Sequence, residues 1–127
     1  MIKVEHLYKG FEGTPVLKDV SVEYEPGKCN MIIGPSGSGK TVLLKNLIGL
    51  MQPDSGDIWY GDMKISDMTS IEKMKLRQRI GILFQGSALF DFATVIENVM
   101  FPMDFFTDWS AAQKKERAQY CLERVDV

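Results

Sequence analysis

A glycine-rich octapeptide constrains this chain more than any other feature. Residues 34–41 read Gly-Pro-Ser-Gly-Ser-Gly-Lys-Thr, a glycine followed by four residues, then Gly-Lys and a hydroxyl residue. Glycines let a chain fold tightly around an anion where a Cβ would clash, and successive backbone N–H groups can then converge on that anion. An apolar run at residues 29–33 precedes the octapeptide, and a helical pattern at residues 41–48 follows it. This order of strand, loop and helix predicts a phosphate-binding loop.

The residue types in the octapeptide suit that chemistry. The Lys40 ammonium can reach the β- and γ-phosphates of a nucleotide, and the Thr41 hydroxyl is the kind of oxygen ligand that Mg²⁺ takes. The N-terminus of the following helix adds free N–H groups and the positive end of its dipole. A glycine-rich turn without a ligand is the alternative. The predicted phosphate contacts come from Gly34, Pro35, Ser36, Gly37, Ser38, Gly39, Lys40, Thr41 and Val42.

Length and charge exclude several other classes of protein. The chain has 127 residues, a length that suits one domain. Lys and Arg total 15 against 17 Asp and Glu, so the net charge is -2. That balance argues against nucleic acid as a partner and against a polybasic membrane anchor. The mean hydropathy of -0.09 is typical of a soluble globular protein.

Hydrophobic patterns predict strands on both sides of the loop. The two longest segments alternate apolar and polar side chains, as strands with one buried face do. Four segments are expected to be strands of this half-buried or short kind: residues 2–8, 16–24, 57–60 and 63–65. Residues 29–33 and 80–84 are nearly continuous apolar runs and predict buried strands of the type found in parallel sheets.

Three capping boxes predict helices after residue 68. In each box a Ser or Thr is followed three residues later by Glu or Gln, so that each side chain can bond the other residue's backbone N–H. The pairs are Thr69 with Glu72, Thr94 with Glu97, and Ser110 with Gln113. The helices are expected to run to about Arg79, Phe101 and Arg124. Residues 101–108 are expected to form a loop, because Pro102 disfavours a helix interior.

Taken together, these motifs resemble the ATP-binding cassette (ABC) ATPases. Residues 34–41 have the form of that family's Walker A loop. Residues 18–27 resemble the strand and turn before the loop, and residues 49–58 resemble the segment after the first helix. Residues 80–85 resemble the strand that leads into the family's Q-loop. The resemblance covers essentially the whole chain.

The resemblance implies an α/β fold, the P-loop NTPase of the ABC-ATPase type. Residues 1–87 would hold an antiparallel β-subdomain, the Walker A loop, part of a RecA-like parallel sheet and the Q-loop strand. Residues 88–127 would begin the helical subdomain. The family's Leu-Ser-Gly-Gly-Gln signature, its Walker B strand and its switch histidine do not occur in this sequence. We therefore expect the chain to be the N-terminal half of a longer ATPase and to be inactive in hydrolysis alone.

The same resemblance assigns cofactors and roles. ATP and Mg²⁺ are the implied cofactors. Phe11 falls where the family places an aromatic that stacks on adenine, with Tyr8 as the other candidate; either residue could instead be a strand or core aromatic. Gln85 would touch Mg²⁺ or the attacking water, or else be a solvated loop residue. Val42 stands where the family usually has a second hydroxyl residue, which puts a side-chain contact to the α-phosphate in doubt.

Partners and location follow from the family as well. Residues 88–106 fall in the region that receives a permease's coupling helix, and exposed aromatics there would suit a partner site. Their alternative place is the core. The full-length protein is expected to be a homodimer in the cytoplasm, peripheral at the inner face of the cell membrane. Residues 83–102 resemble more closely the ATPases of Mla/Mce-type lipid transporters, which implies phospholipid transport.

Two other functions remain open at this point. A truncated or split nucleotide-binding module without ATP turnover would also fit the sequence. A soluble P-loop kinase or GTPase is weaker, since residues 80–85 fit a Q-loop and no guanine-reading Asn-Lys-x-Asp motif is present.

Overall fold

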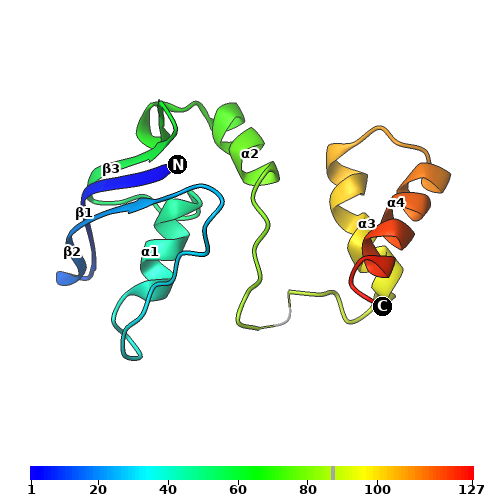
Figure 1. The fold of residues 1–127 in the computed structure, drawn as a ribbon, viewed down its shortest axis with the longest axis horizontal. Coiled ribbons are helices and arrows are strands. Elements are labelled where there is room, and N and C mark those ends of the chain that lie inside the picture. Colours follow the sequence, from blue (N-terminus) through cyan, green and yellow to red (C-terminus); the bar gives the residue numbers. More distant parts are fainter. Residues whose placement is uncertain (87) are drawn as a thin grey trace. The chain divides into compact units, whose positions relative to one another are not determined.

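The structure is a computed structural model that describes residues 1–86 and 88–127. The chain divides into two compact units, Met1–Ile82 and Leu83–Val127, and each is described by itself (Figure 1). None of the helices in the described ranges has the length and hydropathy needed to cross a membrane.

The first unit is built on a four-stranded antiparallel sheet. Its strands are β1 (Ile2–Phe11), β2 (Thr14–Tyr24), β3 (Ser55–Tyr60) and β4 (Met63–Lys64), in the order β2-β1-β3-β4. All four predicted half-buried or short strands are therefore confirmed. The helix α1 (Lys40–Leu47) runs beside the strands, as Figure 1 shows.

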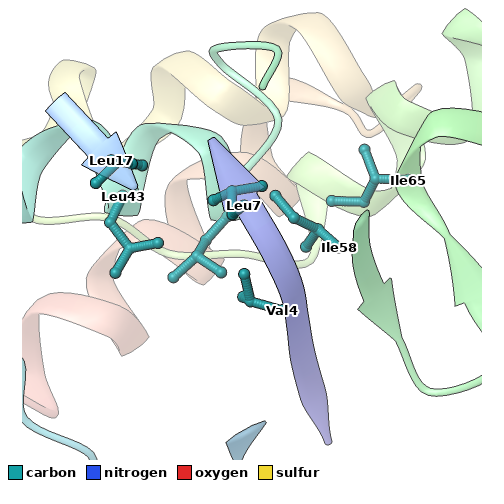
Figure 2. Packing of buried hydrophobic residues seen from close by; sticks show 7 residues of the cluster. Val4, Leu7, Leu17, Leu43, Ile58 and Ile65 are labelled. Atoms are coloured by element: carbon teal, nitrogen blue, oxygen red, sulfur yellow. The ribbon is translucent and has the colours of Figure 1, made fainter. Parts of the chain in front are cut away.

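The core of this unit lies between α1 and the sheet (Figure 2). Val4 and Leu7 from β1 are at most 1% exposed. They belong to a cluster of seven buried apolar side chains: Val4, Leu7, Leu17, Leu43, Leu47, Ile58 and Ile65. Burial of each such side chain contributes about 1.5–3 kcal/mol. This packing fixes α1, and with it the end of the glycine-rich loop, against β1 and β2.

The helices after α1 begin at the predicted caps. After the short 3-10 helix η1 (Ile65–Asp67), α2 spans Ser70–Gln78. The second unit contains α3 (Val95–Phe106) and α4 (Ala111–Glu123). Both hydrogen bonds of the capping box are present at Thr69, Thr94 and Ser110, so the three predicted helix starts are confirmed.

The two predicted buried strands are wrong as strands in this structure. Residues 29–33 and 80–84 form no part of any ladder among the described residues. Met31 and Leu83 are 81% and 97% exposed. An apolar run becomes a strand only when a neighbouring strand takes up its N–H and C=O groups, and every described ladder pairs β1 to β4 among themselves.

The predicted loop at residues 101–108 is also wrong over most of its length. Helix α3 continues through Pro102 to Phe106. A proline inside a helix removes one N–H bond and crowds the carbonyl four residues before it. Side-chain contacts nevertheless support the second half of the helix: the rings of Phe101 and Phe105 are 4.8 Å apart, and Lys114 of α4 lies 2.9 Å from Asp104. These contacts outweigh the helix-breaking tendency that the sequence suggests.

Candidate functional site

The glycine-rich loop ends against β2 at a position that only glycine fits. Gly39 is buried and has φ +95°. A Cβ there would lie 3.0 Å from Leu17 Cδ2 and 3.1 Å from Val16 Cγ1. The left-handed conformation and the close approach both explain why glycine directly precedes Lys40.

The Lys40 side chain links the end of the loop to its start. Its Nζ donates to the carbonyl oxygens of Gly34 and Pro35, each at 2.8 Å. Within the loop, the Ser38 N–H donates to the Pro35 carbonyl at 3.2 Å. An ammonium has three N–H donors, so Lys40 keeps one for a further acceptor. The geometry holds a positive charge directly over the loop.

Helix α1 differs from the other three α-helices in the described ranges because no side chain caps its N-terminus. Gly39 occupies the Ncap position and makes no side-chain bond, whereas α2, α3 and α4 each begin with a complete capping box. The first N–H groups of a helix have no intrahelical acceptor. At α1 they are therefore available to an anion, together with the positive end of the dipole.

Thr41 and Val42 point to different environments. Thr41 is exposed, so its hydroxyl is accessible as an oxygen ligand for Mg²⁺. Val42 is half-buried and packs against the core cluster. This packing explains an apolar side chain at a position where the ABC ATPases usually have a hydroxyl residue. The donors present thus fit a phosphate chain with Mg²⁺: backbone N–H groups, one ammonium and one hydroxyl.

The aromatic candidates lie on β1 in the same unit. Phe11 ends that strand and is 44% exposed, so it is not a core residue. The Nζ of Lys9 lies over its ring, 5.5 Å from the centroid. Tyr8 is similarly exposed. Both residues remain able to meet a flat ligand.

Gln85 and the aromatics of residues 88–106 belong to the second unit. The loop belongs to the first unit, so the role of Gln85 stays a prediction. The aromatics are not buried, contrary to the core alternative. Each residue of this set is at least 37% exposed: Phe90, Phe92, Phe101, Phe105 and Phe106. The rings of Phe90 and Phe101 pack in a tilted arrangement, with 4.5 Å between their centroids and 54° between their planes.

Sequence reasoning missed an ion pair beside Phe11. Asp54 Oδ1 accepts from Lys9 Nζ at 2.8 Å, and its Oδ2 accepts from the Gly10 N–H at 2.7 Å. The bond from Lys9, followed by the bond from Gly10, holds the pKa of Asp54 below its ordinary value. Lys9 and Gly10 precede Asp54 by 45 and 44 residues, so no local pattern in the sequence signals these contacts.

Comparison with known proteins decides the family. A family model described as ABC transporter matches residues 17–127, most of the chain. The chain belongs to the ABC transporter family. ABC cassettes bind ATP with Mg²⁺, which agrees with the donors around residues 34–41.

Individual relatives of this ABC chain support the same conclusion. The L-cystine transport system ATP-binding protein TcyN of Escherichia coli is 43% identical over 104 residues, which cover 78% of this chain and 42% of TcyN. The methionine import ATP-binding protein MetN of Carboxydothermus hydrogenoformans is 38% identical, over 98% of this chain and 36% of MetN. The chain therefore spans less than half the length of these two relatives.

Solved ABC cassettes confirm the fold class. The ATP-binding cassette MJ0796, in a dimeric post-hydrolysis state bound to ADP and Pi, has a TM-score of 0.86 and 30% identity. The match covers 100% of this chain and 58% of that one. The predicted α/β fold of the ABC-ATPase type is thus confirmed.

Proposed function

We propose that this chain binds MgATP and that the intact protein hydrolyses ATP to drive transport through a membrane permease. The observation that carries the proposal is the uncapped N-terminus of α1 behind a loop that Lys40 closes. Free N–H donors and an ammonium at one concavity are what a nucleotide's phosphates require.

The proposed contacts follow the geometry of the loop. Backbone N–H groups of residues 34 and 36–42 hold the phosphates, since Pro35 has none, and the third N–H of Lys40 reaches a β- or γ-oxygen. The Thr41 hydroxyl is a ligand of Mg²⁺, and Gln85 touches Mg²⁺ or the attacking water. Phe11 stacks on adenine, since its ring is exposed in the same unit as the loop. Mg²⁺ supplies charge neutralisation at the phosphates when it is bound.

Residues 88–106 are the proposed contact with the permease. The exposed aromatics on and before α3 form an apolar surface that suits a partner helix. The full-length protein is proposed to be a homodimer, cytoplasmic and peripheral at the inner face of the membrane. Residues 1–87 belong, in this proposal, to the ABC core and residues 88–127 to the start of the helical subdomain.

The cargo has two candidates. Phospholipid transport rests on the resemblance of residues 83–102 to lipid-transport ATPases. Amino-acid import is the second candidate, because TcyN and MetN are named for L-cystine and methionine. Accumulation of labelled methionine or cystine by cells that depend on the intact transporter supports the second candidate. Loss of phospholipid exchange between membranes on deletion of the transporter supports the first.

Substitution of Lys40 tests the proposed function. In the intact protein, Lys40→Ala removes the charge over the loop and is expected to lower MgATP affinity at least tenfold and to abolish hydrolysis. Lys45→Ala is the matched control, since Lys45 lies in the last turn of the same helix. Equal ATP affinity in wild type and Lys40→Ala would contradict the assigned role. Nucleotide binding without turnover by the intact wild-type protein would instead favour the binding-module alternative.

A further inference from the structure

The residues beside Phe11 form a connected arrangement that no part of the proposed function uses. Lys9 lies two residues before Phe11 on β1, and its side chain is only 17% exposed. Its Nζ is shared between the Asp54 carboxylate, at 2.8 Å, and the Phe11 ring, 5.5 Å from the centroid. The ammonium therefore lies between a carboxylate and an aromatic ring.

Asp54 is itself fixed by the backbone of β1. Its N–H donates to the Tyr8 carbonyl at 2.9 Å, and its Oδ2 accepts from the Gly10 N–H at 2.7 Å. The residue thus bonds to β1 through both its backbone and its side chain. Gly10 directly precedes Phe11, so the bond from the Gly10 N–H to Asp54 fixes the backbone next to Phe11. Asp54 also holds the Lys9 ammonium that lies over the Phe11 ring.

We propose that Asp54 and Lys9 are positioning residues that orient Phe11 for stacking on the base of the nucleotide. This inference rests on the proposed role of Phe11 in nucleotide binding. A cation over one face of the ring holds the side chain by a cation–π contact. It leaves the ring's exposed area for a flat base, and stacking is tolerant of which base is present. Asp54 and Lys9 touch neither base nor phosphate themselves and act through Phe11.

The sheet contains a second copy of the same motif that serves as a control. Asp57 Oδ1 lies 2.8 Å from Lys64 Nζ, and Lys64 lies over the Trp59 ring, 5.6 Å from its centroid. This carboxylate, ammonium and aromatic group occupies β3 and β4, apart from Phe11 in the ladder. Loss of either carboxylate removes one ion pair of the same length, but only the pair of Asp54 with Lys9 faces Phe11.

The test separates base binding from phosphate binding in the intact protein. Affinities for MgATP and for Mg-tripolyphosphate, which has no base, are measured for wild type, Asp54→Asn, Lys9→Met and Asp57→Asn. Asp54→Asn and Lys9→Met are expected to weaken MgATP binding about fivefold and to leave tripolyphosphate binding unchanged, because stacking contributes only with a base present. Asp57→Asn is expected to change neither affinity.

A double-mutant cycle with Phe11→Ala checks that the effect acts through the ring. Phe11→Ala alone is expected to weaken MgATP binding about tenfold, and Asp54→Asn should add nothing further in that background. Additive losses, an equal loss of tripolyphosphate affinity, or the same result from Asp57→Asn would each overturn the proposal. An unchanged MgATP affinity in Phe11→Ala would overturn it while leaving the phosphate loop intact. Wild type that binds neither ligand would overturn the proposed function itself.

Discussion

At the scale of single residues, the glycines of the phosphate loop differ in the atoms that an added Cβ would meet. Gly37 and Gly39 both have positive φ, at +78° and +95°. A Cβ on Gly37 would meet nothing within 4 Å, whereas a Cβ on Gly39 would press on Leu17 and Val16. Substituting each glycine in turn therefore separates the free-energy cost of the backbone conformation from that of close packing.

Alanine substitutions at these two glycines should differ in stability. Gly37→Ala is expected to lower the free energy of unfolding by about 1–2 kcal/mol, the cost of the left-handed conformation. Gly39→Ala adds overpacking against β2 and should lower it by about 3 kcal/mol. Urea unfolding of the intact protein measures both values. Equal losses for the two variants would contradict the packing assigned to Gly39.

At the scale of elements, Asn98 joins α3 to the residues that precede it. Its Oδ1 accepts from the Phe90 N–H at 2.8 Å, and its Nδ2 lies 3.0–3.1 Å from the carbonyl oxygens of Phe90, Ala93 and Thr94. One side chain thus contacts four backbone groups, and its two N–H donors are shared among three carbonyls. This amide helps to hold the approach to α3, which carries the exposed aromatics Phe90 and Phe92.

Loss of the Asn98 amide should loosen that segment. Asn98→Ala is expected to cost about 1–2 kcal/mol and to speed exchange of the Phe90 amide hydrogen with solvent. Asn30→Ala is the control, because the Asn30 side chain also donates to two backbone carbonyls but lies in the first unit. Unchanged exchange at Phe90 in Asn98→Ala would show that the amide does not hold the segment.

The capping boxes predict a difference in acid sensitivity between α3 and α4. The hydrogen bonds from the Thr94 hydroxyl and N–H hold the pKa of Glu97 below its ordinary value. A lowered folded pKa means that this stabilisation is complete above the ordinary carboxyl range and is lost as the pH falls through the lowered pKa. The cap of α4 uses Gln113, which does not titrate.

Amide hydrogen exchange should reveal that difference. When the pH falls from 7 to below about 4, the range of an ordinary Glu, protection of the Thr94 amide should decrease beyond the intrinsic pH effect, while that of the Ser110 amide should not. Glu97→Gln keeps an acceptor at the same place and should make the two caps behave alike. An acid response at Thr94 that persists in Glu97→Gln would refute the assignment to Glu97.

The elements also show what a sequence can and cannot predict. The starts of α2, α3 and α4 could be predicted because a capping box needs only residues three apart. Residues 29–33 and 80–84 could not be settled, because a strand depends on partners elsewhere that an apolar run does not identify. The helix over residues 101–106 is hidden from a local pattern because Pro102 signals a break, whereas Asp104 contacts Lys114, ten residues further along the chain.

At the scale of the whole molecule, the loop was the most predictable part of the candidate site. Its chemistry lies in eight consecutive residues, and the helix that follows them is a local feature as well. The ion pair of Lys9 with Asp54 became visible only in the fold, since β1 and the turn before β3 meet across 45 residues. Family membership was evident from motifs, whereas no motif in this chain identifies a cargo.

The measurement that tests the central claim most directly is a titration of the isotope-labelled intact protein with MgATP, followed by backbone amide chemical shifts. The account predicts that the largest shifts fall on residues 37–42, at the uncapped end of α1, while amides at the capped start of α2 near Thr69 stay unchanged. Saturable ATP binding that leaves residues 37–42 unshifted and moves amides elsewhere would contradict it.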